Sequence, residues 1–512
     1  MEKKASSFSG QIGFVLAAAG SAVGVGNLWR FPYLAAKDGG GLFLLVYLVL
    51  VLTFGFTLLT SDIAIGRRTK QSAIRAYETM RPKWKFLGIL TFLVPVLIMT
   101  YYAVIGGWIT KYAVVYLTGQ SAAAAEDGYF TSFITSPVSP VVFALLFMGV
   151  TAFIVYNGVE GGIERVSRYM MPILLVLVVV IAGYALTLRH EDASGQMRTG
   201  MEGLRYYLTP HMEGLTVSRF LQILLDAMSQ LFFSLSVSMG IMITYGSYTG
   251  KEVNLVRSTA MICVFDTLVA LIAGLAIFPS VAHFDPSLLG SSKGVALMFI
   301  ILPQVFESMG GVGQVVSFAF FVMVDIAAIT SVVSLTEVVT QFVIQKFHAH
   351  RKRAALIVAG VCFLVSIPIG ISLGHVAILE ESSPALFGLD WLTFFDEVTN
   401  TVLMPVCALF SCIVVGWFIT PKRAVAEIEA GGTPMAGWLK KVYAVMIRFV
   451  TPALILIVEI GGLQSEIAAG NTAVIVFAYA LVALCVVAYF AFFRNRDTGT
   501  NADEKLSGDY PV

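Results

Sequence analysis

Between residues 12 and 36, an apolar stretch is interrupted by residues that disfavour a continuous helix. The interruption holds three glycines and an asparagine: Gly20, Gly24, Gly26 and Asn27. Inside a bilayer, unpaired backbone N–H and C=O groups are tolerated only where they line a cavity buried in protein. Freed carbonyls suit a small cation, and the N-terminus of the helix that follows suits a carboxylate. The stretch therefore predicts a binding site for a charged solute together with a cation.

A second apolar stretch, residues 218–247, carries the same kind of interruption. Small and hydroxyl-bearing residues gather near its middle: Ser234, Ser236, Ser238 and Gly240. The stretch lies five apolar stretches after the first one. Interruptions at corresponding places in two halves of a chain are typical of transporters built as inverted repeats, whose site lies where the repeats meet. The two stretches together therefore predict a transporter.

Each interruption also has a structural explanation when it is taken alone. Glycines often permit close packing of membrane helices, and Gly20 and Gly24 have the required spacing. Membrane serines often bond only to the backbone of their own helix. The matched position of the two stretches favours the binding site over these explanations.

The composition places these stretches in a membrane. Of the 512 residues, 57% are hydrophobic and 13% are charged, with a mean hydropathy of +0.84, whereas soluble proteins carry about 25% charged residues. Twelve apolar runs are long enough to cross a hydrocarbon core of about 30 Å. They cover residues 12–36, 41–66, 86–118, 140–156, 166–188, 218–247, 255–282, 313–347, 354–374, 391–419, 439–461 and 471–493. We expect an all-α integral membrane protein with twelve transmembrane helices, the first and sixth broken at mid-membrane.

The repeat pattern divides the chain into five segments. Residues 12–188 form the first repeat (spans one to five), residues 218–419 the second (spans six to ten), and residues 439–493 spans eleven and twelve. The N-terminal segment 1–11 and the polar tail 494–512 are expected in the cytoplasm, because 24 of the 33 basic residues then lie on that side. The first span is too long and too glycine-rich for a cleaved signal peptide. We expect a multi-pass protein of the cell membrane.

Other function classes lack the residues that they need. A net charge of +1 gives no reason to expect a nucleic-acid partner. The five cysteines lie in apolar runs without metal-type spacing. No catalytic pair of carboxylates, histidine-rich cluster or phosphate-binding loop marks an enzyme, and the polar residues gather at the two interruptions instead of lining a continuous channel. We therefore expect a carrier in the lipid bilayer.

Several motifs resemble the neurotransmitter:sodium symporter family, in particular its bacterial amino-acid transporters. They are the stretch from Gly20 to Pro32, the triplet from Gly39 to Gly41, the pair Tyr101 and Tyr102, and the run from Phe232 to Ser236. The resemblance covers spans one to ten. It implies a sodium-coupled secondary active symporter that imports neutral, hydrophobic amino acids by alternating access. A transport-inactive amino-acid sensor on the same scaffold is the alternative.

The resemblance implies two sodium sites. The first uses the Ala22 carbonyl, the Asn27 side chain, both oxygens of Ser234, Asp266 and the substrate carboxylate. A bacterial leucine carrier of the family has asparagine at the position of Asp266, so the acid departs from that pattern. An intramembrane acid is costly unless it is protonated or binds a cation. We expect a ligand here, and a buried structural hydrogen bond is the other interpretation.

The second implied sodium site is a neutral cage between spans one and eight. Its oxygens belong to the carbonyls of Gly20, Val23 and Ala327 and to the hydroxyls of Thr330 and Ser331. The alternative is that both hydroxyls bond to their own helix.

The resemblance also implies how a substrate is held. Family members that carry monoamines have an aspartate at the position of Gly24, so here the substrate must bring its own carboxylate, to be bound at a helix N-terminus and by the Tyr102 hydroxyl. The implied contact residues are Ser21, Ala22, Val25, Gly26, Ile98, Tyr102, Phe233, Ser234, Ser236, Met239, Ser331 and Leu335. None is charged, which favours a neutral, hydrophobic amino acid.

Chloride is not expected to be required. Tyr47, Gln230 and Ser234 match the chloride ligands of animal members, but Ala270 replaces a serine of that set. Asp266 lies one helical turn before Ala270 and supplies a negative charge of its own.

The gates complete the implied mechanism. Arg30 and Asp396 match the outer ion pair of the family, with Tyr102 and Phe233 as a lid beneath it; Arg30 reaching only toward the interface is the alternative. The inner ion pair is missing, because Gln345 replaces the acid. We expect a weaker polar contact from Lys3 or Lys4, which would favour inward-open states.

Overall fold

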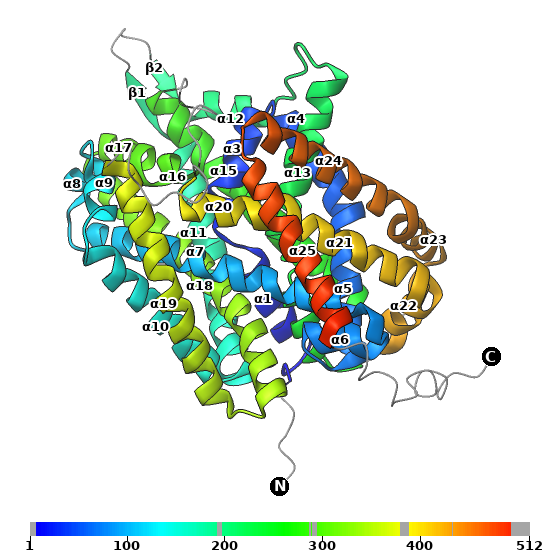
Figure 1. Ribbon diagram of the computed structural model, residues 1–512. Helices are drawn as coiled ribbons and strands as arrows, with labels where there is room; N and C mark the ends of the chain where they lie inside the picture. The colour runs from blue at the N-terminus through cyan, green and yellow to red at the C-terminus, as the bar shows by residue number, and fades with distance from the viewer. Residues whose placement is uncertain are drawn as a thin grey trace.

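The protein is built almost entirely of helices that lie against one another (Figure 1). A computed structural model describes residues 7–191, 197–285, 288, 294–378, 389–432 and 434–492. Within these residues, 10 helical runs are long and apolar enough to cross a membrane. They are Gly41–Thr69, Pro82–Leu117, Ser139–Tyr156, Val159–Ala185, Leu255–Phe284, Gly311–Phe347, Arg351–Ser372, Trp391–Ile419, Gly437–Ala468 and Thr472–Phe490.

These 10 runs correspond to ten of the expected spans, several with the expected ends within a few residues. The largest difference is at the fifth span, which was expected from residue 166 and begins at Val159 with the π-helical segment η3 (Val159–Glu164) before α11 (Arg165–Ala185). Polar and glycine residues there hid the helical start, because the sequence criterion was an apolar run.

The other two expected spans are each divided. Helix α1 (Gln11–Ala22) ends before Gly24, whose backbone is extended (φ −117°, ψ −173°), and the chain resumes as α2 (Val25–Leu28) and α3 (Arg30–Lys37). Helix α13 (Val217–Ser234) is separated from α14 (Ile241–Ser247) by five residues outside either helix, and a sixth, Gly240, caps α14. Both stretches therefore expose backbone groups that a continuous helix would satisfy.

The second interruption has unusual backbone geometry. Ser236 and Ser238 both have positive φ, at 52° and 63°, and Gly240 has φ of 75°. Side-chain-bearing residues rarely adopt this left-handed region, and such strain persists only where the surroundings enforce it. The surrounding helices must therefore hold this segment in place.

The divided helices lie among the longest ones. Helix α1 packs against α11, α15 (Leu255–Phe284) and α18 (Gly311–Phe347), and α7 (Lys85–Leu117) packs along α18. Helix α14 packs against α5 (Phe56–Thr69), which continues α4 (Gly41–Leu50) and η1 (Val51–Gly55). In Figure 1, α7 crosses the middle of the molecule. The interruptions are thus shielded by protein on several sides.

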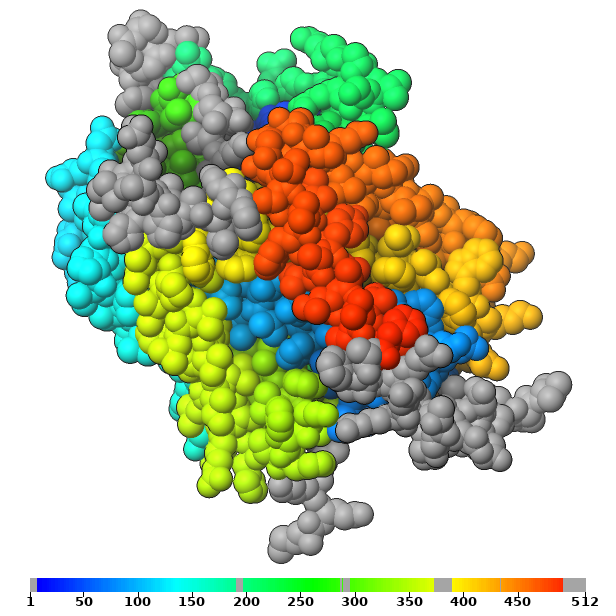
Figure 2. Space-filling model, in the orientation of Figure 1, coloured from blue at the N-terminus to red at the C-terminus, as the bar shows by residue number. Residues whose placement is uncertain are grey.

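The outer face of the molecule is apolar. Figure 2 shows a face covered by α19 (Arg351–Ile378), α24 (Thr451–Ala468) and α25 (Thr472–Phe492). Large apolar side chains are exposed there, among them Val361, Leu364, Val487 and Phe490. Exposed apolar residues along membrane-length helices are the expected contact with lipid.

Short elements connect the long helices. At one end lie β1 (Arg189–Glu191), antiparallel to β2 (Met197–Thr199) with Arg189 opposite Thr199, and α12 (Gly200–Leu208). Nearer the other end lie α6 (Ala73–Met80) and α22 (Pro421–Ile428) (Figure 1). Further connecting helices are α8 (Ser121–Ala125), α9 (Tyr129–Ile134), α16 (Gly294–Ala296), η5 (Leu297–Ile301) and α17 (Leu302–Ser308). The sequence analysis assigned no elements to these segments.

The remaining helices complete the bundle. Helix α10 covers Ser139–Tyr156. The span at Trp391–Ile419 comprises α20 (Trp391–Glu397), η6 (Val398–Leu403), α21 (Met404–Ile413) and η7 (Val414–Ile419). Before α24 come α23 (Gly437–Val445) and η9 (Met446–Val450). The division of the chain into two repeats remains a prediction.

Candidate functional site

A buried carboxylate joins both interruptions. Asp266, on α15, is fully buried, and Asn27 Nδ2 donates to its Oδ1 at 2.8 Å. Ser234 Oγ, at the end of α13, lies 2.9 Å from each carboxylate oxygen. The ion pairs found among the described residues do not include Asp266. A buried anion surrounded by neutral groups is costly without a cation. Three of the residues expected at the first sodium site are thus brought together, and Ala22, the fourth, ends α1 beside them in sequence.

Two further polar groups in this region have no hydrogen-bond partner. The Tyr47 hydroxyl and Gln230 Oε1 are both buried and unpaired, while Gln230 Nε2 donates to the Gly26 carbonyl at 3.3 Å. Both residues match chloride positions of animal relatives. Ala270, the position that departs from that set, is fully buried as well.

The oxygens expected at the second sodium site lie between α1 and α18. Ser331 Oγ donates toward the carbonyls of Ser21 (3.3 Å) and Val23 (3.5 Å). Thr330 Oγ1 lies 3.0 Å from the carbonyl of Ile326 and 3.1 Å from that of Ala327, both on its own helix. Gly20 faces the Thr330 side chain, because a Cβ added there would lie 3.3 Å from Thr330 Cβ. One hydroxyl therefore crosses to α1 and the other follows the backbone-bonded alternative.

The N-terminus of α2 points at a tyrosine. The Val25 N–H donates to Tyr102 Oη at 3.1 Å, and the Gly24 N–H donates to Asn27 Oδ1 at 3.2 Å. A Cβ on Gly24 would lie 3.0 Å from Ser331 Oγ and 3.3 Å from Tyr102 Oη. The absence of a side chain at Gly24 therefore keeps open the space where a carboxylate can meet both the helix N-terminus and the tyrosine.

A narrow cavity adjoins this helix end. Its volume is about 20 Å³, which suits a water molecule and is too small for an amino-acid side chain. Nine of the expected contact residues line it, together with Gly24 and Ile241: Ser21, Ala22, Ile98, Tyr102, Phe233, Ser236, Met239, Ser331 and Leu335. Val25 and Gly26 line the larger cavity above, and Ser234 contacts Asp266 instead. Ser236 Oγ donates to the Ser21 carbonyl at 3.0 Å, which joins the two interruptions.

A second, larger cavity opens on the other side of Tyr102 and Phe233. Its volume is about 460 Å³, and both aromatic residues line both cavities. Their rings are stacked, with centroids 6.4 Å apart. We call the larger cavity the vestibule. The two rings separate it from the narrow cavity, which is the arrangement expected of a lid.

The predicted outer ion pair lines the vestibule without a direct contact. Arg30 donates to Ser229 Oγ at 2.8 Å. Asp396 Oδ1 accepts from Tyr101 Oη at 2.8 Å and from Asn400 Nδ2 at 2.6 Å. Their pairing, which would close the vestibule, remains a prediction.

Charged residues surround the mouth of the vestibule. Lys37 pairs with Asp226 at 2.5 Å, and Arg219 pairs with Asp38 at 3.0 Å. Asp38 lies in the connection between α3 and α4. Burial is the main cause that raises its pKa to about 7, and the nearby Asp226 carboxylate raises it further.

The opposite side of the site is closed by the segment before α1. Phe8 is buried among the rings of Phe14, Tyr245 and Tyr248, with centroids 5.6, 5.6 and 6.1 Å from its own. Its N–H donates to the Tyr248 carbonyl at 3.2 Å. Lys3 and Lys4, the residues expected to form the inner contact, lie outside the described residues. Gln345 accepts from the Ser72 N–H at 2.9 Å.

Glu164 holds the same segment. Ser9 donates to this nearly fully buried carboxylate through its N–H (2.8 Å) and its hydroxyl, and Arg168 pairs with it at 2.6 Å. Next to it, Glu337 accepts from Tyr248 Oη and from Arg351, both at 2.5 Å. Sequence reasoning missed both acids, because neither belongs to an interruption. Their only signal was a charged residue within or beside an apolar span.

Asp62 is a third acid that sequence reasoning missed. It is fully buried on α5, and its Oδ2 accepts the Ser238 N–H at 2.9 Å. This bond holds one of the two left-handed serines of the second interruption.

Comparison with known proteins places these observations in a family. The family model described as "Sodium:neurotransmitter symporter family" matches residues 5–132 and 134–494. The uncharacterized sodium-dependent transporter YhdH of Bacillus subtilis is 34% identical over 462 residues, which cover 89% of this chain and 97% of YhdH. The human sodium- and chloride-dependent GABA transporter 2 is 25% identical over 466 residues, which cover 81% of this chain and 73% of that protein.

A solved structure resembles the whole fold. The crystal structure of MhsT in complex with L-phenylalanine is similar with a TM-score of 0.78 and 35% sequence identity. The similarity covers 89% of this chain and 99% of that chain.

Proposed function

The chain belongs to the sodium:neurotransmitter symporter family of multi-pass, sodium-dependent membrane transporters, and from this we propose that it imports neutral, hydrophobic amino acids together with sodium ions. Its relatives are transporters and not enzymes. The proposal includes twelve transmembrane helices, with the first and sixth broken at the depth of the site. It also includes a cell-membrane location with both termini in the cytoplasm.

The cluster of Asp266, Asn27 and Ser234 is the observation that carries the proposal. It combines a buried carboxylate, an amide and a hydroxyl at the meeting point of both interrupted helices. Oxygen ligands of this kind suit a hard cation such as Na⁺. The adjacent α2 N-terminus and Tyr102 supply donors for a carboxylate. A zwitterionic amino acid would thus complete the sodium shell with its own carboxylate.

The lining of the narrow cavity supports a neutral, apolar side chain. Its side chains include Ile98, Phe233, Met239 and Leu335, and none of the lining residues is charged. A charged guest side chain would lose its hydration without gaining a partner. The L-phenylalanine in the MhsT structure supports an amino acid of this class. Because the cavity is narrow here, binding a larger guest requires the lining to move apart, and Met239 is adaptable enough to do so.

The proposal includes two sodium ions, and the second is the less supported one. The carbonyls of Gly20 and Val23 and the Ser331 hydroxyl face each other between α1 and α18. Sodium at this place would join the two helices and so favour the closed cytoplasmic side.

Uptake and counterflow in proteoliposomes test the proposal. With a sodium gradient, unlabelled phenylalanine, leucine and methionine should each compete with labelled phenylalanine, whereas lysine and glutamate should not. Removal of sodium should abolish uptake. Exchange of internal for external substrate distinguishes a carrier from the transport-inactive sensor, which would bind without exchange. Sodium-dependent binding without counterflow would overturn the transport function.

Replacement of chloride tests the role of Asp266 as the fixed negative charge. Uptake should be unchanged when gluconate replaces chloride. In Asp266→Asn, the remaining uptake should be stimulated by chloride, because Tyr47 and Gln230 then face an anion site without its charge. A clear loss of uptake by the unaltered protein in gluconate would contradict chloride independence.

A further inference from the structure

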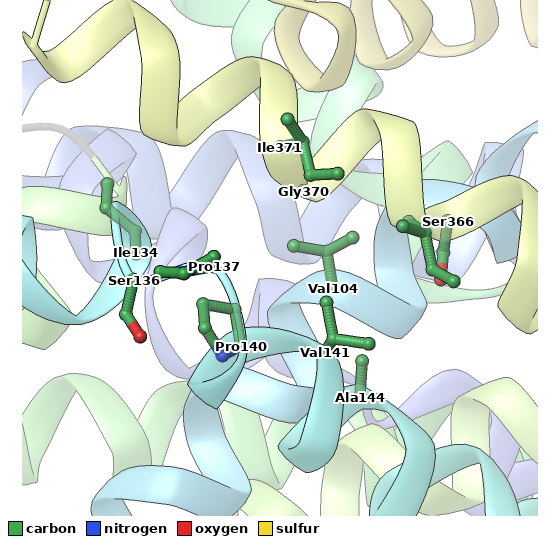
Figure 3. A pocket seen from close by; sticks show the side chains of 11 residues that line it. Val104, Ile134, Ser136, Pro137, Pro140, Val141, Ala144, Ser366, Gly370 and Ile371 are labelled. Atoms are coloured by element: carbon green, nitrogen blue, oxygen red, sulfur yellow. The ribbon is translucent and has the colours of Figure 1, made fainter.

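A groove outside the transport site opens between α7, α10 and α19. Figure 3 shows Val104 and Val141 facing Gly370 and Ile371 across it, with Ile134 and Pro140 at one end. Its lining is otherwise apolar except for Ser136 and Ser366. The Ser366 hydroxyl is used by its own helix, because it donates to the Phe363 carbonyl at 2.7 Å. The groove therefore offers contact area for a hydrocarbon chain.

The mouth of the groove faces the surroundings of the protein and not its interior. Ile371 is 45% exposed, and its neighbours on the same outer surface include Val142 and Leu145 on α10 and Leu364 on α19, which are all exposed. These residues belong to helices long and apolar enough to cross a membrane. The material that meets this mouth in the bilayer is therefore lipid.

Two glycines shape the groove. At Gly107 an added Cβ would lie 2.6 Å from the Ala144 backbone nitrogen, so α7 and α10 cross in direct contact there. At Gly370 an added Cβ would meet only Val104, at 3.6 Å. The first glycine fixes the crossing of the two helices. The second leaves the floor hollow where a larger side chain would fill it.

A cation lies at one end of the groove. Lys111 shares a face of α7 with Val104 and Gly107, seven residues or about 10 Å beyond Val104 along the helix. Its ammonium lies 5.4 Å from the Phe143 ring centroid and 5.9 Å from that of Phe133. Phe143 precedes the lining residue Ala144, and Phe133 precedes Ile134. The ion pairs of the described residues do not include Lys111. Two aromatic rings thus hold this charge beside the groove.

We propose that this groove binds an anionic phospholipid, with an acyl chain between α7, α10 and α19 and the head-group phosphate on Lys111. The spacing of about 10 Å along α7 separates a charged end from an apolar floor, as the head group and acyl chain of a lipid are separated. A basic residue between transmembrane helices is a known way of selecting anionic head groups. The proposal requires only the membrane location of the protein and none of the transport steps.

Native mass spectrometry of the detergent-purified full chain tests the proposal. The probes are phosphatidylglycerol and phosphatidylcholine with identical acyl chains. Phosphatidylglycerol should bind more tightly. Lys111→Gln should weaken phosphatidylglycerol binding about fivefold, the effect of one surface charge on an anionic lipid, and should leave phosphatidylcholine unchanged. Gly370→Leu, which fills the floor, should weaken both lipids.

Two further variants make the outcome decisive. Lys352→Gln is the matched control, because the Lys352 ammonium also lies over an aromatic ring (Tyr156, 4.9 Å) but the residue is at the start of α19, away from the groove; it should bind as the unaltered protein does. Ile371→Trp covers the mouth from its exposed side and replaces Gly370→Leu if that variant does not fold. Equal binding of phosphatidylglycerol by the unaltered protein and Lys111→Gln would overturn the head-group assignment. Unchanged binding of both lipids by the filled variant would overturn the groove.

Discussion

At the scale of single residues, the site depends on charges that are buried without an opposite charge nearby. Asp266 is held by an amide and a hydroxyl, whereas the buried Arg67 has Glu427 beside it at 2.9 Å. A buried pair of opposite charges needs no further ion. A buried carboxylate with neutral neighbours does, or it must take up a proton. This contrast separates the proposed ion ligand from the structural charges of the same protein.

Replacement of Asp266 by asparagine should weaken sodium more than substrate shape. The change keeps the volume and the hydrogen bond from Asn27 but removes the charge. The sodium concentration for half-maximal amino-acid binding should rise at least about tenfold, which corresponds to about 1.4 kcal/mol. Scintillation proximity binding at several sodium concentrations measures it.

Glu459→Gln is the matched control for this experiment. Glu459 is also a buried acid in a spanning helix, paired with the Tyr479 hydroxyl at 2.6 Å, but it lies on α24, outside the two expected repeats. Its replacement should leave the sodium dependence unchanged. An equal shift in both variants would mean that Asp266 acts through general stability and not as a ligand.

Asp38 should make stability depend on pH. Its native pKa is about 7, mainly because of burial, against an ordinary value of 3.8. The native state therefore binds a proton more tightly than the unfolded state, so this stabilisation is complete below about pH 4 and is lost as the pH rises through 7. Lys37, Arg219 and Asp226 face this group and limit the effect.

Thermal unfolding of the purified protein and of Asp38→Asn between pH 5 and pH 8.5 checks this expectation. The difference in Tm between the two proteins should change in favour of Asp38→Asn as the pH rises, since the variant lacks the ionisation. A difference that is constant across this range would rule out titration of Asp38 in it.

At the scale of elements, the interruptions matter because of what holds them. The first is held by hydrogen bonds from Val25 to Tyr102 and from Gly24 to Asn27. The second is held by Asp62, which accepts from Ser238. Each broken helix is therefore fixed by side chains of other helices, and a movement of α1 or α14 changes both the ion site and the narrow cavity.

The segment before α1 should act as the inner closure through Glu164. Glu164→Ala removes two bonds from Ser9 and the pairing with Arg168. A hydrogen bond to a charged group contributes about 1.5–3 kcal/mol, so the closed state should lose at least about tenfold in population. The label is placed at Ser247→Cys, which is buried near Phe8 and Tyr248 in the closed form. Its rate of reaction with a maleimide should rise by this factor.

Glu160→Ala provides the control for the closure. Glu160 lies on the same π-helical segment as Glu164 but is exposed. Its replacement should not change the labelling rate. If Glu164→Ala labels as slowly as Glu160→Ala, another contact holds the segment closed.

At the scale of the whole molecule, the two sides of the site differ. The vestibule of about 460 Å³ reaches the Tyr102 and Phe233 lid from one side, whereas Phe8 and its aromatic neighbours cover the other. The expectation from the sequence was a weak inner contact and a preference for inward-open states. The contacts in the structure are those of a closed inner side, because Phe8, Ser9 and Glu164 supply what the missing ion pair does not.

Substrate and sodium together should close the vestibule by bringing Arg30 to Asp396. Leu392 lines the vestibule, and the five native cysteines are all buried, so a Leu392→Cys variant can be labelled with little background. Labelling should slow at least about fivefold when sodium and phenylalanine are both present, and sodium alone should not have this effect. The same variant with Asp396→Asn should lose the protection. Labelling that is indifferent to substrate would show that the vestibule does not close.

The sequence by itself determined the membrane class, most of the span positions and the chemistry of the site. Apolar runs of membrane length are required by the bilayer, so they can be read without knowledge of packing. The pattern at Gly20–Asn27 and Ser234–Gly240 was readable for the same reason, because a membrane helix tolerates such residues only for a purpose. The family match and the overall fold agree with that interpretation.

Only the tertiary structure decided which distant residues meet. The pairings of Glu164 with Ser9, of Asp62 with Ser238 and of Lys111 with two phenylalanines join residues far apart in the chain. The same holds for the separation of Arg30 from Asp396 across an open vestibule. Composition and periodicity report what one segment requires of its solvent. Contacts between segments, and the conformation in which a gate rests, follow from the packing of all helices together, which no local pattern encodes.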